Sequence, residues 1–420
     1  MIRTLFITCI LYIMSIGLNA LAQESYRTKI MRDDIKSLEI KVEGKLVSTP
    51  FIELNGEQRI EITFDALFHT TGRFAYSVIH CDGGWTKSRL LPIEYMKGFQ
   101  NETIKDYAMA IGTTTSYVNY KIVFPSEDTQ FTVSGNYVIQ VYEEDRPGKI
   151  VLTACFSIVE SLVEINASVS GNTDIDFNRE HQQVEFIINP KGLNLLYPQT
   201  DLKVFVYQNH NLNDVRANIQ PLMIINRQLH YRNNRDLIFE AGNEFRRIEF
   251  LTHRISGMGV ESTGFFNPYY HMTLYKDRKR NRSPYLYDQD QNGRFFINCA
   301  GCKDPDTEGD YYVVHFSLAS EQIPNGTMHL FGDLFNNSLD SQSQMDYNPQ
   351  TEAYEKAILL KTGLYNYHYA FKEEGGTKPS FRQTEGNFFE TENEYTIAVY
   401  FCPMGARYDR LIGYQTINSR

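Results

Sequence analysis

The 420-residue chain lacks the sequence patterns on which the common enzyme classes depend. It contains no G-x-S-x-G nucleophile turn, no H-E-x-x-H zinc motif and no glycine-rich loop of the kind that cradles phosphate. Its many carboxylates show no spacing that singles out an acid–base pair. We therefore expect no catalytic residues, no cofactor and no metal, in a protein that is not an enzyme.

Long apolar runs are missing everywhere except at the N-terminus. After the first 22 residues no stretch approaches the ~20 consecutive apolar residues of a membrane helix. Before that point, Arg3 precedes an apolar run from Leu5 to Leu18, and residues 20–22 supply the small residues that a signal peptidase needs. Cys9 lies within the run and has no small residue before it, so we do not expect lipidation. We predict a cleaved signal peptide over 1–22 and an exported chain that begins near Gln23.

Basic residues are fewer than acidic residues. The chain has 41 lysines and arginines against 51 aspartates and glutamates, which gives a formal net charge of −10. A chain this acidic is not expected to bind nucleic acid through its overall field. The one basic cluster, from Lys276 to Arg282, is typical of a solvated loop, and we assign it no function.

Tryptophan occurs once, whereas there are 28 tyrosines and 27 phenylalanines. Several short runs alternate strictly between apolar and polar residues, as strands with one buried face do. No segment sustains the 3.6-residue apolar period of a helix, and Asn-Gly pairs at 55–56, 292–293 and 325–326 suit the positive φ of tight hairpins. We predict an all-β fold of immunoglobulin-like or early-set β-sandwiches. The alternating runs are Arg73 to Cys81, Tyr137 to Glu143, Val151 to Val159, Leu202 to Tyr207, Tyr311 to Leu318 and Tyr395 to Phe401.

The length exceeds that of one compact domain, so two or three sandwiches are expected. The apolar run from Val151 to Glu164 marks the end of the first, and the acidic segment from Asp304 to Asp310 has the composition of a linker before the last. We therefore predict an N-terminal sandwich over 23–160, a middle sandwich over 161–308 and a C-terminal sandwich over 309–420.

Residues 78–85, VIHCDGGW, bring together the reactive side chains His80, Cys81 and Asp82 and the only tryptophan, Trp85. In a strand successive side chains point to opposite faces, so His80 and Asp82 share one face while Cys81 lies on the other. The three cannot converge on one centre without a bulge. We interpret the stretch as a strand end where His80 and Asp82 hydrogen-bond each other and Trp85 caps the sandwich edge; a catalytic or metal site is the alternative.

Five cysteines remain after removal of the signal peptide, and Cys299 and Cys302 are spaced as C-x-x-C. A zinc site would need a second such pair, and a redox motif would need a helix N-terminus behind it. Export favours a disulfide that staples the loop, with two free thiols as the alternative. Because the total is odd, at least one thiol stays unpaired within the chain. The other three cysteines are Cys81, Cys155 and Cys402.

The segment from Asp288 to Gly293 copies the opening of a calcium-binding loop, with oxygen ligands at alternate positions and glycine at the sixth. The twelfth position, where a bidentate glutamate should stand, is Cys299. We interpret the segment as an acidic hairpin that turns at Asn292 and Gly293.

Residues 328–371 contain an apolar-Phe-Gly strand, a polar loop and a later strand with the pattern Tyr-x-Tyr-x-Tyr. This order resembles the early-set sandwiches that accompany starch- and glycogen-handling enzymes. Those modules usually stack tryptophans on the sugar, and this segment has none. The loop offers Phe335, Asn336 and Asn337 instead.

A longer series of segments, in order and covering about residues 34–414, resembles the plug protein family of the Bacteroidetes type IX secretion system. The segments are VIHCDGGWTKSRLLPIEYMKGFQNETIKDY, FPSEDTQFTVSGNYVIQVYEED, HQQVEFIINPKGL, FEAGNEFRRIEF, PYLYDQDQNGRFFI, DPDTEGDYYVVHFSL and EGNFFETENEYTIAVYF.

The resemblance implies a periplasmic, non-enzymatic protein at the inner face of the outer membrane. Its partner would be a giant outer-membrane translocon barrel, whose periplasmic opening it would close when no cargo is engaged. The family has no catalytic residues to transfer, and the sequence does not identify the partner-binding residues. The alternative is a periplasmic or surface carbohydrate-binding protein that uses Tyr365, Tyr367 and Tyr369 of the C-terminal sandwich.

Overall fold

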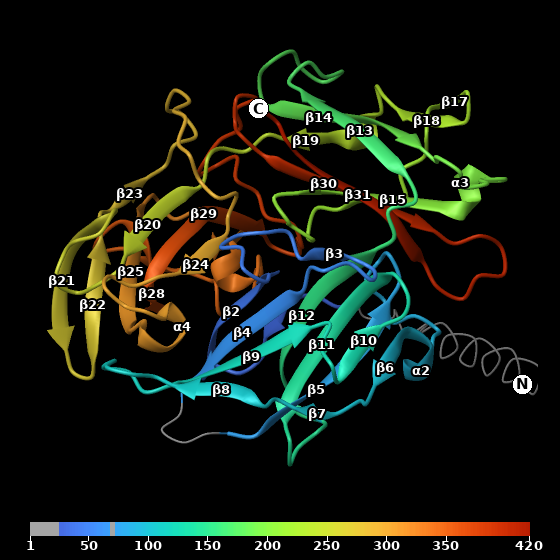
Figure 1. Cartoon of the computed structure of the whole chain (residues 1–420). Coiled ribbons are helices and arrows are strands. Elements are labelled where there is room, and N and C mark those ends of the chain that lie inside the picture. The colour runs from blue at the N-terminus through green and yellow to red at the C-terminus, as the bar shows by residue number, and fades with distance from the viewer. Residues whose placement is uncertain (1–24, 68–71) are drawn as a thin grey trace, which may run out of the picture.

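A computed structural model describes residues 25–67 and 72–420 (Figure 1). The regular structure consists almost entirely of strands, whose larger sheets pack in pairs around three separate apolar cores. The predicted all-β class of β-sandwiches is confirmed. The predicted signal peptide, with Cys9, lies outside the described residues. Within the described ranges no helix has the length and apolar character needed to cross a membrane.

The first sandwich is formed by one sheet in the order β1-β12-β11-β5-β7, with β3 beside β12, and a second in the order β2-β4-β9-β8. The first sheet contains β1 (Lys29–Ile30), β3 (Phe51–Glu53), β5 (Phe74–Cys81), β7 (Glu102–Thr103), β11 (Gly135–Glu143) and β12 (Ile150–Val159). The second sheet contains β2 (Ile35–Val42), β4 (Ile60–Ala66), β8 (Asp106–Met109) and β9 (Val118–Phe124). A short helix and a two-stranded ribbon flank them: α2 (Pro92–Tyr95), β6 (Met96–Gly98) and β10 (Thr129–Phe131).

The second sandwich joins strands from the middle of the chain to the two last strands, β30 and β31. One sheet contains β13 (Glu164–Ser170), β14 (His181–Asn189), β17 (Met223–Ile225), β18 (Gln228–Tyr231) and β19 (Ile238–Glu240). The other contains β15 (Leu202–Gln208), β16 (Arg216–Ala217), β30 (Glu394–Phe401) and β31 (Arg410–Asn418). Two single-turn helices belong to it, α3 (Pro198–Asp201) and η1 (Arg235–Leu237).

The third sandwich is built from residues that lie between these two parts of the second. One sheet contains β20 (Arg246–Phe250), β24 (Phe295–Ile297), β26 (Gly326–Phe331) and β29 (Gly363–Glu373). The other contains β21 (Val260–Phe266), β22 (Tyr269–Leu274), β23 (Asp277–Arg278), β25 (Tyr311–Ala319), β27 (Asp346–Asn348) and β28 (Ala353–Lys361). Its helical turns are α4 (Pro305–Glu308) and η2 (Asp333–Phe335).

The six alternating runs of the sequence all form strands, namely β5, β11, β12, β15, β25 and β30. Alternation identifies a strand because a pleated backbone buries every second side chain. The positive φ predicted at the Asn-Gly turns is confirmed, since Asn55, Asn292 and Asn325 have φ of 61°, 53° and 61°. Asparagine tolerates this left-handed conformation better than most residues. The predicted hairpins are wrong, because none of these turns joins two strands that pair with each other.

The predicted boundaries at 308 and 309 are wrong, because the third sandwich is inserted into the second. β15 pairs along its whole length with β30, so residues 202–208 and 394–401 share one sheet. β20, placed in the predicted middle domain, pairs instead with β29. Alternation identifies a strand but carries no information about its partner, which is why the sequence pattern missed this pairing.

The two connections that lead into and out of the third sandwich lie side by side. The amide of Phe388 donates to the carbonyl oxygen of Gly242 at 2.8 Å, and the amide of Gly242 donates to the side chain of Asn387 at 3.0 Å. The side chain of Asn243 donates to the carbonyl oxygen of Glu385 at 2.9 Å. A domain whose ends are this close can be inserted into a turn of another without distorting it.

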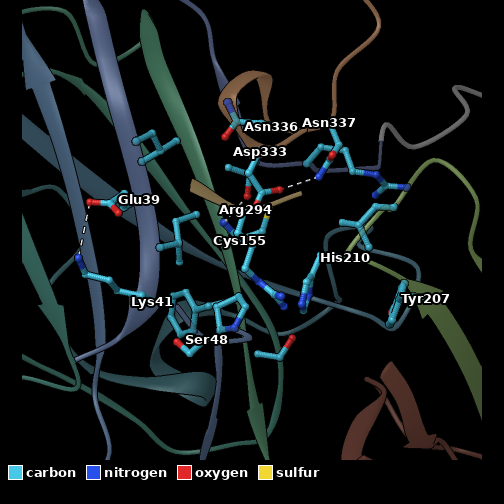
Figure 2. A pocket seen from close by; sticks show the side chains of 18 of the residues that line it. Glu39, Lys41, Ser48, Cys155, Tyr207, His210, Arg294, Asp333, Asn336 and Asn337 are labelled. Atoms are coloured by element: carbon cyan, nitrogen blue, oxygen red, sulfur yellow. Dashed lines mark hydrogen bonds and ion pairs between the residues drawn. The ribbon is translucent and has the colours of Figure 1, made fainter. Parts of the chain in front are cut away.

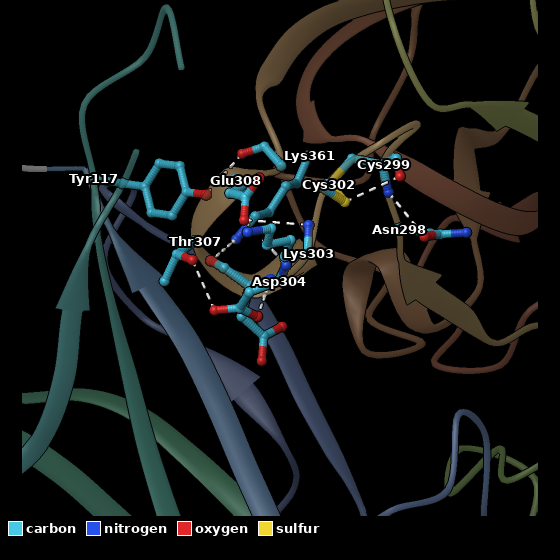
Figure 3. Close-up of a disulfide and its surroundings, with 11 residues drawn as sticks. Tyr117, Asn298, Cys299, Cys302, Lys303, Asp304, Thr307, Glu308 and Lys361 are labelled. Atoms are coloured by element: carbon cyan, nitrogen blue, oxygen red, sulfur yellow. Dashed lines mark hydrogen bonds between the residues drawn. A yellow bond between two sulfur atoms is a disulfide. The ribbon is translucent and has the colours of Figure 1, made fainter. Parts of the chain in front are cut away.

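The acidic segment from Asp304 to Asp310 contacts the first sandwich and is not the free linker that its composition predicted (Figure 3). The Asp310 carboxylate accepts from the amides of Thr114 and Thr115 at 3.0 and 3.1 Å. The carbonyl oxygen of Thr307 accepts from an amide of the first sandwich at 2.9 Å. We call residues 304–310 the clasp.

A buried ion pair lies directly behind the clasp. The ammonium group of Lys361 lies 2.7 Å from the carboxylate of Asp65, and their side chains are 1% and 0% exposed. The same carboxylate accepts from the hydroxyl of Tyr311 at 2.7 Å and from the side chain of Asn119 at 2.8 Å. The ammonium also donates to the carbonyl oxygen of Asp306 at 2.6 Å, so both charges are compensated by further polar partners.

Cys299 and Cys302 form a disulfide immediately before the clasp (Figure 3). The loop staple favoured by the C-x-x-C spacing is therefore the arrangement found. Cys81, Cys155 and Cys402 are free. Burial raises the pKa of the Cys155 thiol to about 12, so this thiol stays protonated and unreactive at neutral pH.

We predict that Lys361→Met lowers the free energy of unfolding by about 3–5 kcal/mol, because it leaves the charge of Asp65 buried without its partner. Urea unfolding of the mature chain measures the change. Lys378→Met is the matched control, since the Lys378 side chain is 60% exposed where it pairs with Asp214, and it should cost less than about 1 kcal/mol. Equal effects of the two substitutions would contradict the assigned role of the buried pair.

We also predict that the mature chain, unfolded without reductant, exposes three titratable thiols, and that reduction raises the number to all five of its cysteines. A colorimetric thiol titration in denaturant measures both numbers. The Cys299→Ser/Cys302→Ser double variant should give three in either condition, the same three free thiols. Five thiols before reduction would show that the disulfide is absent.

Candidate functional site

His80 lies in a cage of aromatic rings inside the first sandwich. Its ring centroid is 5.7, 5.1 and 5.4 Å from those of Tyr95, Tyr137 and Tyr408. Nε2 lies 3.2 Å from the carbonyl oxygen of Ser134, which can only accept, so Nε2 carries the proton. Nδ1 then accepts from the hydroxyl of Ser88 at 2.8 Å. Burial lowers the pKa of His80 to about 4, so the ring is neutral at pH 7. Both of its nitrogens have hydrogen-bond partners.

Cys81 points to the opposite face of β5, as alternation predicted, and packs with Val138 and Cys155. The predicted hydrogen bond between His80 and Asp82 is wrong, because His80 points into the core. Asp82 lies past the end of the strand, where its carboxylate accepts from the amide of Asp409 in the second sandwich at 3.2 Å.

The end of the VIHCDGGW stretch is a contact between the first and second sandwiches. A Cβ on Gly83 would lie 2.7 Å from the ring of Phe205 on β15, so only glycine fits there. Trp85 is buried against Cys81 and Cys155, and so it packs at this junction and does not cap an open sandwich edge. Tyr400 on β30 donates to the side chain of Asn136 on β11 at 2.8 Å.

In the segment that resembles a calcium loop, the carboxylates of Asp288 and Asp290 are bound by other groups of the protein. The Asp290 carboxylate accepts from the amides of Phe245 and Asn292, and the Asp288 carboxylate pairs with Arg247. Burial raises the pKa of Asp290 to about 7, which weakens it further as a cation ligand. The chain does turn at Asn292, but extended backbone without strand pairing precedes it, so the predicted hairpin is only a turn. Within the described residues no group of three or more His, Cys, Asp or Glu side chains could hold a metal ion.

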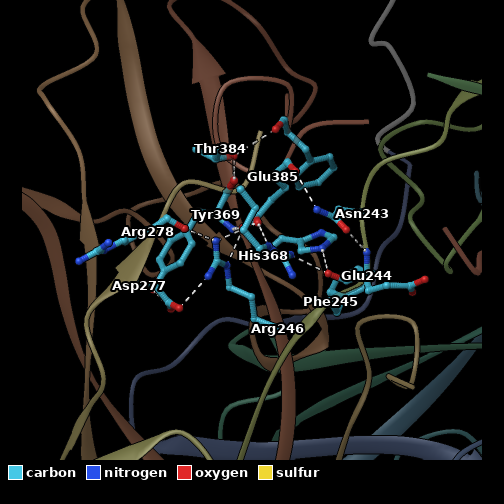
Figure 4. A network of polar contacts seen from close by, with 12 residues as sticks. Asn243, Glu244, Phe245, Arg246, Asp277, Arg278, His368, Tyr369, Thr384 and Glu385 are labelled. Carbon is cyan, nitrogen blue, oxygen red and sulfur yellow. Dashed lines mark hydrogen bonds and ion pairs between the residues drawn. The ribbon is translucent and has the colours of Figure 1, made fainter. Parts of the chain in front are cut away.

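The basic cluster from Lys276 to Arg282 is partly structural (Figure 4). The fully buried Glu385 carboxylate lies 3.1 Å from the Arg246 guanidinium and 2.8 Å from that of Arg280. These two cations hold the pKa of Glu385 well below its usual range, against the opposing effect of burial. Arg246 also pairs with Asp277 at 2.7 Å. The cluster was predicted to be a solvated loop, and the structure corrects this for Asp277 and Arg280.

The three tyrosines of the carbohydrate-binding alternative lie in the apolar core of the third sandwich. Tyr365, Tyr367 and Tyr369 are 2%, 3% and 0% exposed. The hydroxyls of Tyr367 and Tyr369 both donate to the Asp277 carboxylate at 2.8 Å. None of the three rings is available to stack on a sugar.

The three sandwiches line a partly open cavity of about 360 Å³ where they meet (Figure 2). The first sandwich contributes Glu39, Lys41 and Ser48, and the second contributes Tyr207 and His210. The third contributes β24 and the loop that follows Gly332, with Asn336 and Asn337. This loop was the predicted sugar-facing loop, and in the structure it faces the other two sandwiches.

Charged groups at the cavity are paired with one another. One carboxylate oxygen of Glu394 lies 2.5 Å from Nε2 of His210 and 2.7 Å from the guanidinium of Arg294, which joins the second sandwich to the third. Burial raises the pKa of Glu39 to about 7, although Lys41 opposes the shift. Asp333 also has a raised pKa because it is buried, and Asn337 donates to it at 2.8 Å.

The cavity therefore lies at the junction of the three sandwiches, and several polar side chains in its wall have partners within the protein. His210 is engaged by Glu394, the hydroxyl of Ser48 accepts from the amide of Val42, and the nearby Cys155 thiol is protonated. In the same wall the hydroxyl of Ser338 donates to the Asp340 carboxylate at 2.9 Å. The residues that organise this junction, above all Asp65, Lys361 and Glu394, carry no local sequence signal, because their partners are far away in the chain.

Comparison with known proteins matches this architecture to one family. A family model described as "Type 9 secretion system plug protein 1st domain" matches residues 35–160, which contain nearly all of the first sandwich. No curated protein gave a match.

One solved structure is similar over almost the whole chain. The crystal structure of a hypothetical protein from Parabacteroides merdae ATCC 43184, at 2.30 Å resolution, is 54% identical with a TM-score of 0.93, and the match covers 94% of this chain and 100% of that one. The B domain of a biofilm-associated protein is 10% identical with a TM-score of 0.18, which is too low to support any argument. The first sandwich therefore belongs to the type 9 secretion system plug protein family, which implies an association with that secretion system.

Proposed function

We propose that this chain is a periplasmic plug that binds the outer-membrane barrel of the type IX translocon and closes its periplasmic opening when no cargo is engaged. Closure requires a wide body that keeps its shape when it is pressed against an opening. Release requires that the barrel exchanges its contact with this chain for a contact with another partner. This exchange involves no chemical step.

The observation that carries the proposal is the way in which the three sandwiches are joined. Each pair of sandwiches shares a buried contact: Asp65 with Lys361, Tyr400 with Asn136, and Arg294 with Glu394. Separated domains on flexible linkers would move independently and leave gaps. Three bodies that are each fixed to the other two supply a single wide stopper.

The charged composition of the chain is compatible with an interface to the barrel that forms and separates. The chain is 22% charged, with acids in excess of bases. Interfaces that form and separate are about as polar as the rest of a protein surface, whereas obligate interfaces resemble a domain core. We favour the plug over carbohydrate binding because the three tyrosines required for sugar stacking are buried.

We predict that the tagged chain, purified from detergent-solubilised outer membranes, brings down a very large barrel protein. Deletion of the gene should raise the uptake of a large hydrophilic antibiotic, because an unplugged lumen leaks, and re-expression of the unchanged chain should restore the barrier. Absence of a barrel from cells that express the secretion machinery would contradict the assigned partner. A barrel recovered without any change in permeability would contradict the plugging role.

Because His80 is buried inside the first sandwich, we assign it a role in packing and none in catalysis. Between about pH 6.5 and pH 4 the unfolded chain binds a proton at residue 80 that the folded chain does not, so acidification destabilises the fold. We predict that His80→Gln, which does not titrate, reduces the loss of unfolding free energy between pH 7 and pH 5 by roughly 2 kcal/mol. Urea unfolding at both pH values measures it. His329 and His368, whose pKa values burial also lowers to about 4, contribute equally to both proteins. An unchanged pH dependence would contradict the role.

A further inference from the structure

Exposed apolar side chains gather at the end of the molecule where the first and second sandwiches meet. Ile93, Phe99 and Met404 are 85%, 77% and 99% exposed. They stand on a short helix, on the turn after β6 and on the loop between β30 and β31. We call the following six exposed residues the apolar rim: Leu91, Ile93, Phe99, Leu196, Tyr197 and Met404.

Contacts between the segments hold the rim together as one surface. The amide of Cys402 donates to the carbonyl oxygen of Asp201 at 2.7 Å, which fixes the loop of Met404 beside α3. The guanidinium of Arg407 in the same loop binds the Glu94 carboxylate of α2 at 2.5 and 3.0 Å. In Figure 1 the loop between β30 and β31 reaches from the second sandwich toward α2, with α3 above it. The segments that carry the rim are therefore held next to one another across two sandwiches.

The segments that carry the rim bear a net charge opposite in sign to that of the whole chain. Residues 86–99, 191–200 and 402–407 contain five lysines and arginines but a single acid, Glu94, whereas acids outnumber bases over the full sequence. All five cations are exposed. They are Lys87, Arg89, Lys97, Lys191 and Arg407.

We propose that the apolar rim docks the protein onto the surface of an anionic phospholipid bilayer. The rim side chains project from turns and single-turn helices, and such isolated projections fit the fluid boundary between headgroups and acyl chains. The surrounding lysines and arginines complement the phosphates of anionic lipids. This inference goes beyond the plugging of a barrel and does not depend on it, because the bilayer itself is the partner.

Sedimentation with lipid vesicles tests the proposal on the mature chain. Vesicles of phosphatidylcholine alone should leave the protein in solution, and vesicles that also contain phosphatidylglycerol should sediment it. Raising the salt from about 0.1 to about 0.5 M should weaken binding, because the charges are exposed and screened. The Ile93→Ser/Met404→Ser variant should lower the partition coefficient for the anionic vesicles by about tenfold or more.

The matched control is Ile255→Ser/Met258→Ser, which replaces the same two residue types. Ile255 and Met258 are exposed on the third sandwich, 71% and 40%, between β20 and β21. This control should bind the vesicles as the unchanged chain does, and thermal unfolding should show that both variants fold.

Failure to sediment with anionic vesicles, or equal binding by the rim and control variants, would overturn the proposal. So would a rim variant that binds vesicles normally but no longer brings down the barrel, since the rim would then contact protein. The vesicles contain no barrel, so this result stands apart from the test of the plug.

Discussion

The buried ion pair between Lys361 and Asp65 is the constraint on which the arrangement of the molecule depends. Both charges are removed from water, and they lie against each other only while the first and third sandwiches stay in contact. Separating the two buried charges costs more than opening an apolar contact of the same size. The third sandwich is inserted into the second, and the second packs on the first. A fixed contact between the first and third therefore closes the ring of three.

This closed ring explains a feature of the strands that a single sandwich does not have. β12 is buried along nearly its whole length, although alternation predicts burial of only one face. Phe156 and Ile158 face the core of the first sandwich. Cys155 and Val159 on the other face belong to the small apolar clusters at the junction with the second sandwich. The VIHCDGGW stretch contributes to the same junction, so its reactive residue types serve packing at a domain contact.

The sequence predicted the features that depend on neighbouring residues and missed the contacts between residues that are far apart in the chain. The six alternating strands, the Asn-Gly turns and the opposite orientations of His80 and Cys81 all follow from backbone geometry over a few residues. The pairing of β15 with β30 joins residues almost 200 positions apart, and no property of either strand alone specifies it. The clasp looked like a linker because an acidic, proline-containing segment has the same composition whether water or a neighbouring domain satisfies its polar groups. Family resemblance supplied the association with secretion, which composition and spacing could not provide.

The central claim is that the three sandwiches act as one body that closes a translocon. Electron cryo-microscopy of the translocon, purified without cargo from cells that carry this chain, tests it most directly. The account predicts density for all three sandwiches across the periplasmic mouth of the barrel, with the contact between Asp65 and Lys361 intact. An open mouth in particles that contain the chain, or a chain whose first and third sandwiches have separated, would contradict it.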